Sequence, residues 1–169
     1  VDLSAMLNRL GREYTRVAAD KGLHFEVSVA ADCHVLSDEV LLERVLRNLL
    51  SNAIRYTEVG AVSLSTDIND ARCIVAVQDT GLGIPQEDHG RVFDECYRVG
   101  SSRYMADGHG LGLSIVNRLL SLMNTPIRFQ SETGIGTLIE VSLVRNQLCE
   151  PSHTTESELS LNGNCVLVI

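Results

Sequence analysis

The clearest pattern in the chain is an apolar stripe that recurs at spacings of three and four residues between Asp38 and Thr57. Such spacing is typical of the buried face of an α-helix. The stripe consists of Val45, Leu46, Leu49, Leu50 and Ala53. The Ser37-Asp38-Glu39 stretch before it supplies residues that favour a helix start. We therefore predict a helix here, and we expect the rest of the chain to be organised around it.

A line of polar side chains follows another face of the same predicted helix. Arg44, Asn48, Asn52 and Tyr56 stand four residues apart, so they should form one ridge, and Arg55 borders it. Asparagine is a poor helix former, and two asparagines one turn apart suggest that something uses them. On this segment alone, an ordinary solvated face is an equally good interpretation.

Helical spacing also predicts two other helices. The first covers Val1 to about Asp20, with Asp2 or Ser4 as its N-cap and Lys21-Gly22 as its end. The other runs from Leu113 to about Asn124. A short helix is expected over 86–90.

Alternation of apolar and polar residues predicts the strands. The candidate segments are 23–29, 34–36, 61–69, 72–79, 127–131 and 137–144. Asn69-Asp70 is a natural turn, so the segments on either side of it should form an antiparallel hairpin.

Two glycine-rich segments are candidates for ligand contacts. Asp79-Thr80-Gly81-Leu82-Gly83 follows a predicted strand, where glycines let the backbone approach a ligand and Asp79 faces a cleft. A plain turn with Asp79 as a local cap is the alternative. Gly108-His109-Gly110-Leu111-Gly112 opens the last helix, and free N–H groups at a helix start favour phosphate. Arg91 to Asp107, between them, is predicted as a long loop.

Composition narrows the possible functions. The chain has 169 residues, 44% hydrophobic and 21% charged, which suits one globular domain. A net charge of −8 argues against nucleic-acid binding. Five cysteines without a CxxC pair suggest reduced thiols in a cytoplasmic compartment, and no apolar run has the length of a membrane span. Because the chain lacks an initial Met, we expect it to be a piece of a longer protein.

The order of these motifs resembles the ATP-binding catalytic domain of sensor histidine kinases, a group related to the type II topoisomerase, mismatch-repair and heat-shock chaperone ATPases. The resemblance covers about Val1 to Val144. It implies an α/β two-layer sandwich, with a mixed, mostly antiparallel sheet of about five strands under three helices and a mobile ATP lid over 91–107.

The resemblance also implies roles for single residues. Asn52 would coordinate the Mg²⁺ bound to ATP, Asn48 would support that site, and Asp79 would accept a hydrogen bond from the adenine amino group. Arg55 would meet phosphate, and Tyr56 would pack near the nucleotide. The remaining implied ATP-binding residues are Gly81, Gly83, Ile84, Arg98, Gly108, His109, Gly110, Leu111, Gly112, Leu113 and Thr137.

The residue four positions before Asn52 distinguishes kinases from hydrolases in this group. The hydrolysing relatives carry a glutamate there that activates water, whereas this chain has Asn48, and an amide cannot take a proton. Glu43 and Glu39 should lie off the ridge. The sequence therefore favours transfer of the γ-phosphate to a histidine over fast hydrolysis.

The expected acceptor histidine lies on an upstream dimerisation domain outside this chain. We predict residues 1–22 as the end of that dimerising hairpin, 23–146 as the kinase domain, 147–163 as a linker, and 164–169 as the possible first strand of a receiver domain. The full-length protein would be a homodimer. This portion of it would be cytoplasmic, and only other portions of the full-length protein would be bound to the inner membrane. Its partner would be a receiver domain or response regulator.

One departure from the family pattern keeps an alternative open. Glu95 and Cys96 stand where the family commonly has Pro and Phe. A degenerate module that binds nucleotide and regulates a partner kinase by contact is therefore the second hypothesis.

Overall fold

The computed structural model of the chain describes residues 1–69, 71–94 and 112–146. Three α-helices are present, namely α1 (Leu3–Asp20), α2 (Glu39–Tyr56) and α3 (Gly112–Leu122), together with the short 3₁₀ helix η1 (Gln86–Asp88). The strands are β1 (His24–Ser28), β2 (Val35–Leu36), β3 (Ala61–Ile68), β4 (Arg72–Asp79), β5 (Ile127–Glu132) and β6 (Gly136–Arg145).

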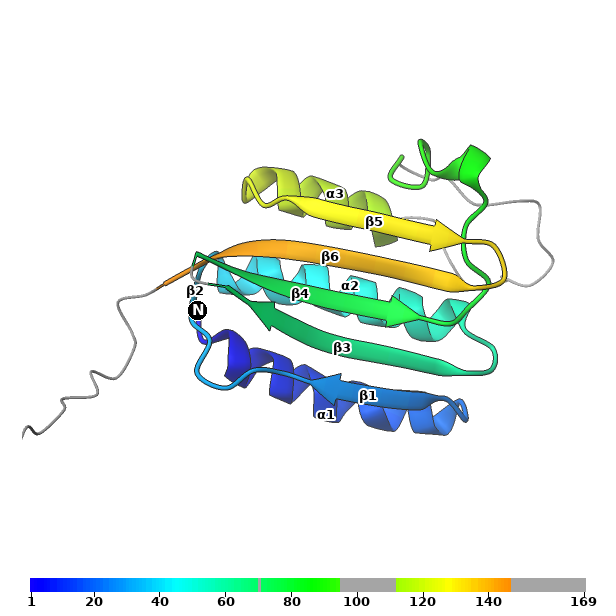
Figure 1. The fold of residues 1–169 in the computed structure, drawn as a ribbon, viewed down its shortest axis with the longest axis horizontal. Coiled ribbons are helices and arrows are strands. Elements are labelled where there is room, and N and C mark those ends of the chain that lie inside the picture. The colour runs from blue at the N-terminus through cyan, green and yellow to red at the C-terminus, as the bar shows by residue number, and fades with distance from the viewer. Residues whose placement is uncertain (70, 95–111, 147–169) are drawn as a thin grey trace, which may run out of the picture.

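The six strands form one mixed sheet, with the order β1-β3-β4-β6-β2 and with β5 also paired to β6 (Figure 1). β1 and β3 are parallel, and α2 lies in the connection between them. All other pairs are antiparallel, including the predicted β3–β4 hairpin. The predicted two-layer sandwich is confirmed. The sheet has more than the expected five or so strands because the two-residue β2 pairs with the end of β6.

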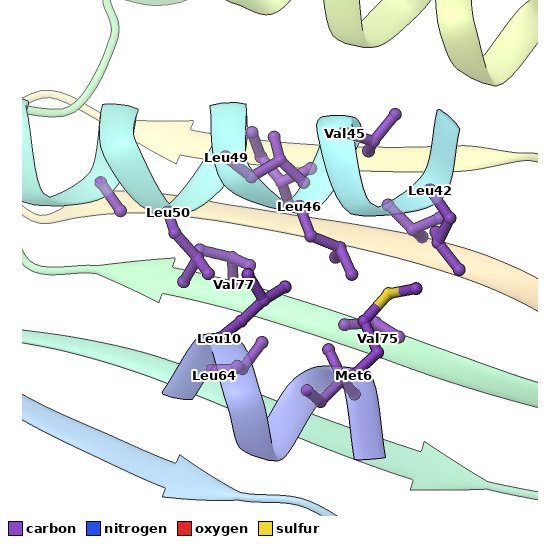
Figure 2. Close-up of a cluster of buried hydrophobic side chains, with 14 of the residues drawn as sticks. Met6, Leu10, Leu42, Val45, Leu46, Leu49, Leu50, Leu64, Val75 and Val77 are labelled. Carbon is purple, nitrogen blue, oxygen red and sulfur yellow. The ribbon is translucent and has the colours of Figure 1, made fainter. Parts of the chain in front are cut away.

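The helices cover one face of the sheet (Figure 1). Met6 and Leu10 from α1 meet Leu64 of β3 and Val75 and Val77 of β4, together with the apolar stripe of α2 (Figure 2). Alternate residues of β3 and β4 are buried, as their sequence pattern predicts. Burying these side chains provides the main driving force for the fold.

α1 belongs to the same core as the sheet. Leu3, Leu7, Leu10 and Ala18 are fully buried. Asp2 is the N-cap, since its side chain accepts a hydrogen bond from the backbone N–H of Ala5 at 2.9 Å. The continuation of α1 into a dimerising hairpin stays a prediction.

Several predictions lie outside the described residues. They concern the lid from residue 95 onward, the ATP-binding residues Arg98 and 108–111, the linker 147–163 and the candidate receiver strand 164–169. None of the helices in the described residues combines the length and the hydropathy of a membrane-spanning segment.

Candidate functional site

α2 presents the predicted polar ridge. Asp38 begins the helix by accepting a hydrogen bond from the backbone N–H of Leu41 at 2.8 Å. The apolar face of α2 is buried, whereas Asn48 and Asn52 are half-buried and Tyr56 is 36% exposed. Asn48 Nδ2 donates a 2.7 Å hydrogen bond to the carbonyl oxygen of Arg44, one turn earlier. The two amides therefore lie on the accessible side of a helix that the core holds in place.

The start of α3 meets this ridge at Asn52. A Cβ built on Gly112 would lie 2.8 Å from Asn52 Nδ2 and 2.9 Å from Asn52 Oδ1. A glycine allows the first turn of α3 to approach the amide this closely. The start of a helix directs free N–H groups and the positive end of its dipole outward, so an anion beside Asn52 would be stabilised there.

Glu43 points away from the ridge, as predicted. Its carboxylate accepts hydrogen bonds from Arg9 of α1 at 2.7 Å and from Arg47 at 2.9 Å. Arg47 also contacts Glu13 of α1 at 2.7 Å. The carboxylate closest in sequence to Asn48 is thus engaged in an ion-pair network between α1 and α2.

Asp79 ends β4 beside the first residues of β6. Its backbone pairs with Thr137, and its Oδ1 accepts a hydrogen bond from the backbone N–H of Gly81 at 2.9 Å. Burial raises the pKa of the Asp79 carboxyl, and hydrogen bonds from the backbone N–H groups of Gly81 and Thr137 partly oppose this shift. The site therefore holds a partly desolvated acceptor with a fixed orientation.

Gly81 joins Asp79 to the end of α2. A Cβ on Gly81 would clash with the carbonyl oxygen of Tyr56 and would lie 2.9 Å from Thr57 Oγ1. The next residue, Leu82, donates its backbone N–H to the Tyr56 carbonyl oxygen at 3.2 Å. The end of α2 and the turn that follows Asp79 are thus in direct contact.

The β5–β6 hairpin supports the loop that follows Asp79. Gly83, at φ +63°, lies so close to the Glu132 carbonyl that a Cβ there would clash. The Leu82 carbonyl accepts a hydrogen bond from the backbone N–H of Gly134 at 2.8 Å, and Ser131 Oγ accepts one from the backbone N–H of Ile84 at 2.8 Å. These contacts hold residues 82–84 against the turn of the β5–β6 hairpin.

Aromatic contacts hold the end of this loop against β5. The rings of His89 and Phe93 both meet Phe129 edge-on, with centroids 5.1 and 5.5 Å apart. His89 Nε2 also lies 2.9 Å from the carbonyl oxygen of Ile84. The first four residues of the predicted lid, 91–94, are therefore packed against β5, because Phe93 contacts Phe129 and Val92 is buried.

The donor atoms around Asn52 suit a phosphate-bound magnesium ion better than a metal held by the protein alone. Within residues 1–69, 71–94 and 112–146, no three His, Cys, Asp or Glu side chains gather as a metal site. Mg²⁺ prefers oxygen ligands, keeps several waters and commonly shares phosphate oxygens with one or two protein groups. An amide oxygen beside a helix start fits that chemistry.

The structure brings together most of the described residues that the sequence nominated. These residues come from α2, from β4 and the turn after it, from α3 and from β6: Asn48, Asn52, Tyr56, Asp79, Gly81, Gly112 and Thr137. Leu113 is half-buried and packs against the core, and Ile84 is anchored to Ser131. The individual roles of these residues stay predictions. Sequence reasoning missed Ser131 and Lys21, whose contacts depend on distant segments.

Comparison with known proteins gives consistent matches. The profile of the family described as histidine kinase-, DNA gyrase B- and HSP90-like ATPase matches residues 37–147. The chain is 33% identical over 141 residues to the sensor histidine kinase RcsC of Escherichia coli (strain K12), covering 82% of this chain and 15% of that protein. It is 38% identical over 149 residues to the sensor-like histidine kinase SenX3 of Mycolicibacterium smegmatis, covering 85% and 38%.

Solved structures are similar as well. The mycobacterial sensor histidine kinase MprB superposes with a TM-score of 0.74 at 28% identity, covering 86% of this chain and 97% of that one. Full-length ShkA in complex with AMPPNP gives a TM-score of 0.74 at 29% identity, covering 86% and 31%.

Proposed function

This chain belongs to the family of histidine kinase-, DNA gyrase B- and HSP90-like ATPases, and from that membership we propose that it binds Mg-ATP and donates the γ-phosphate to a histidine outside this chain. The acceptor would lie on an upstream dimerisation domain of the full-length protein. Because the chain spans only 15% and 38% of RcsC and SenX3, that acceptor and the whole protein's activity belong to the proposal.

The observation that carries the proposal is the meeting of Asn52 with the start of α3, and it is supported by the contact between the end of α2 and the turn after Asp79. In this arrangement Asn52 would hold Mg²⁺, and the N–H groups at the start of α3 would face phosphate. Bound Mg²⁺ would neutralise phosphate charge. Asp79 would accept a hydrogen bond from the adenine amino group.

Transfer is favoured over hydrolysis because no glutamate stands one turn before Asn52 on α2. Asn48 stands where a water-activating glutamate would be needed, and Glu43 is held by Arg9 and Arg47. Phosphoryl transfer depends on positioning and on charge neutralisation, which the described groups can provide.

In the full-length protein, the partners would be a second copy of the same chain and a receiver domain or response regulator. We place this domain on the cytoplasmic side of the membrane.

The test uses this chain joined to its natural upstream segment and incubated with γ-labelled ATP. The proposal expects label in an acid-labile, base-stable bond, as a phosphohistidine requires. Intact ATP binding without any label would overturn the transfer step and favour a module that regulates another kinase by contact.

A further inference from the structure

The last turn of α2 has a complete set of partners for its carbonyl oxygens, and Lys21 supplies two of them. The Ala53 carbonyl accepts from Thr57 Oγ1 at 2.7 Å, and the Tyr56 carbonyl accepts from the Leu82 backbone N–H. Lys21 Nζ, at the end of α1, donates to the carbonyls of Ile54 at 2.6 Å and Arg55 at 2.9 Å. The last four carbonyls of a helix have no partner within the helix, so these contacts fix how α2 ends.

Lys21 makes a third contact of the same kind. Its Nζ donates to the Thr57 carbonyl at 2.7 Å, so all three N–H donors of the ammonium meet backbone oxygens of α2 and its C-cap. A cation at this end of a helix also complements the helix dipole. Lys21 joins the end of one helix to the end of another across 33 to 36 residues of sequence.

The residue at position 21 is a lysine, whereas the other basic residues of the chain that carry a permanent charge are arginines. Of the chain's 14 lysines and arginines, Lys21 is the only lysine. An ammonium presents three tetrahedral donors on a compact charge, whereas a guanidinium presents a planar fork suited to carboxylates and phosphates. Three carbonyls converging from one helix end match the ammonium.

We propose that Lys21 is a positioning residue for the nucleotide site. It holds the turn that carries Arg55 and Tyr56, and the Tyr56 carbonyl in turn holds Leu82 next to the Asp79–Gly81 turn. Lys21 itself is placed on α1, far in sequence from the residues that it orders. This inference rests on the proposed function only where ATP affinity is the readout.

Tyr14 offers a matched control, because it also ties α1 to α2. Its hydroxyl donates to the Arg47 carbonyl at 3.2 Å and lies 3.0 Å from Ser51 Oγ. These contacts fall in the middle of α2, away from its last turn. A general loss of contact between the two helices would affect Tyr14→Phe and Lys21→Met alike, whereas loss of positioning would affect Lys21→Met alone.

The experiment compares the wild-type chain with Lys21→Met and Tyr14→Phe. Hydrogen exchange of the Leu82 amide, measured without nucleotide, reports directly on the Tyr56–Leu82 contact. Lys21→Met should speed this exchange relative to the amides of the β4 core and weaken ATP binding by about tenfold, while Tyr14→Phe should change neither. Calorimetry at a temperature where all three proteins are folded gives the affinities.

Two results would overturn the proposal. One is wild-type exchange at Leu82 in Lys21→Met, and the other is an equal effect in Tyr14→Phe. If Lys21→Met does not fold, Lys21→Arg is measured in the same way, because it keeps the charge and alters the donor geometry. If the wild-type chain binds no ATP, the proposed function fails, and the exchange of Leu82 still decides the role of Lys21.

Discussion

The side chain of Asn52 on α2 lies against Gly112, the first residue of α3, so closely that a Cβ at Gly112 would stand 2.8 Å from Asn52 Nδ2. Gly112→Ala should therefore displace the Asn52 amide. We expect the affinity for Mg-ATP to fall about tenfold, or about 1.4 kcal/mol, while the helix itself tolerates alanine. Calorimetry with and without Mg²⁺ measures the change.

Gly90→Ala is the control for that variant, because nothing lies within 4 Å of a Cβ built there. It should bind Mg-ATP as the wild-type chain does. An unchanged affinity in Gly112→Ala would show that the amide has room to move without loss.

Asn52→Ala should remove the increase in ATP affinity that Mg²⁺ produces, because the amide oxygen is the only ligand that we assign to the ion on the protein. Titrations of ATP in excess Mg²⁺ and in excess EDTA measure this increase. Asn117→Ala is the control, because Asn117 is an exposed asparagine on α3. This variant should keep the increase in ATP affinity that Mg²⁺ produces. A full Mg²⁺ effect in Asn52→Ala would contradict the assignment.

ATP binding should weaken on acidification. Burial raises the pKa of Asp79 above its ordinary 3.8, so the carboxylate that accepts from adenine becomes protonated at a higher pH than an exposed aspartate does. The affinity for ATP should fall as pH drops through that raised pKa. Asp79→Asn should lose this dependence and bind ATP more weakly at neutral pH.

The folding stability of the nucleotide-free chain should depend on pH in the direction opposite to ATP affinity, through the same Asp79 carboxyl. A carboxyl whose pKa is higher in the folded state than in the unfolded state costs stability when it is ionised, above the folded pKa. That cost is relieved as pH falls from the raised value towards 3.8. Unfolding in urea as a function of pH, compared between wild type and Asp79→Asn, isolates this contribution.

Glu43→Gln should leave any slow release of phosphate from ATP unchanged, because the carboxylate faces α1 and its arginine partners. Its partners Arg9 and Arg47 are 52% and 37% exposed, so losing the ion pairs should cost only about 0.5–1 kcal/mol of folding free energy. A phosphate-release assay and urea unfolding test the two expectations. A fall in phosphate release would show that Glu43 reaches the attacking water.

Leu46→Ala should cost about 2–5 kcal/mol of folding free energy, since the side chain is fully buried between α2 and the sheet. Val40→Ala, on the same helix, is the control because Val40 is 75% exposed, and it should change stability by no more than about 0.5 kcal/mol. Urea unfolding monitored by circular dichroism distinguishes them.

Local sequence signals predicted most of the elements. The spacing of the α2 stripe, its Asp38 cap and the Asn69-Asp70 turn act over a few residues, so helix and hairpin follow from them. The sequence does not decide whether Asp2 or Ser4 is the N-cap of α1. The structure shows why: Ser4 donates to the Ala30 carbonyl and accepts from the backbone N–H of Cys33, both distant in sequence.

Contacts between distant segments could not be read from such signals. Lys21 looks like an ordinary helix end, and its use by α2 depends on how the two helices pack. Ser131 reads as one polar residue of a strand, yet its hydroxyl joins Ile84 to Thr137. The one available signal was that Lys21 is the only lysine in the chain.

The parallel pairing of β1 with β3 bears on when binding competence arises during folding. His24 pairs with Ala61, so α2 must be accommodated within that connection before the two strands can join. Pairings of this kind form late, because a long stretch of chain must be ordered first. A nucleotide added during refolding should consequently bind only the completed domain and should not bind earlier collapsed states.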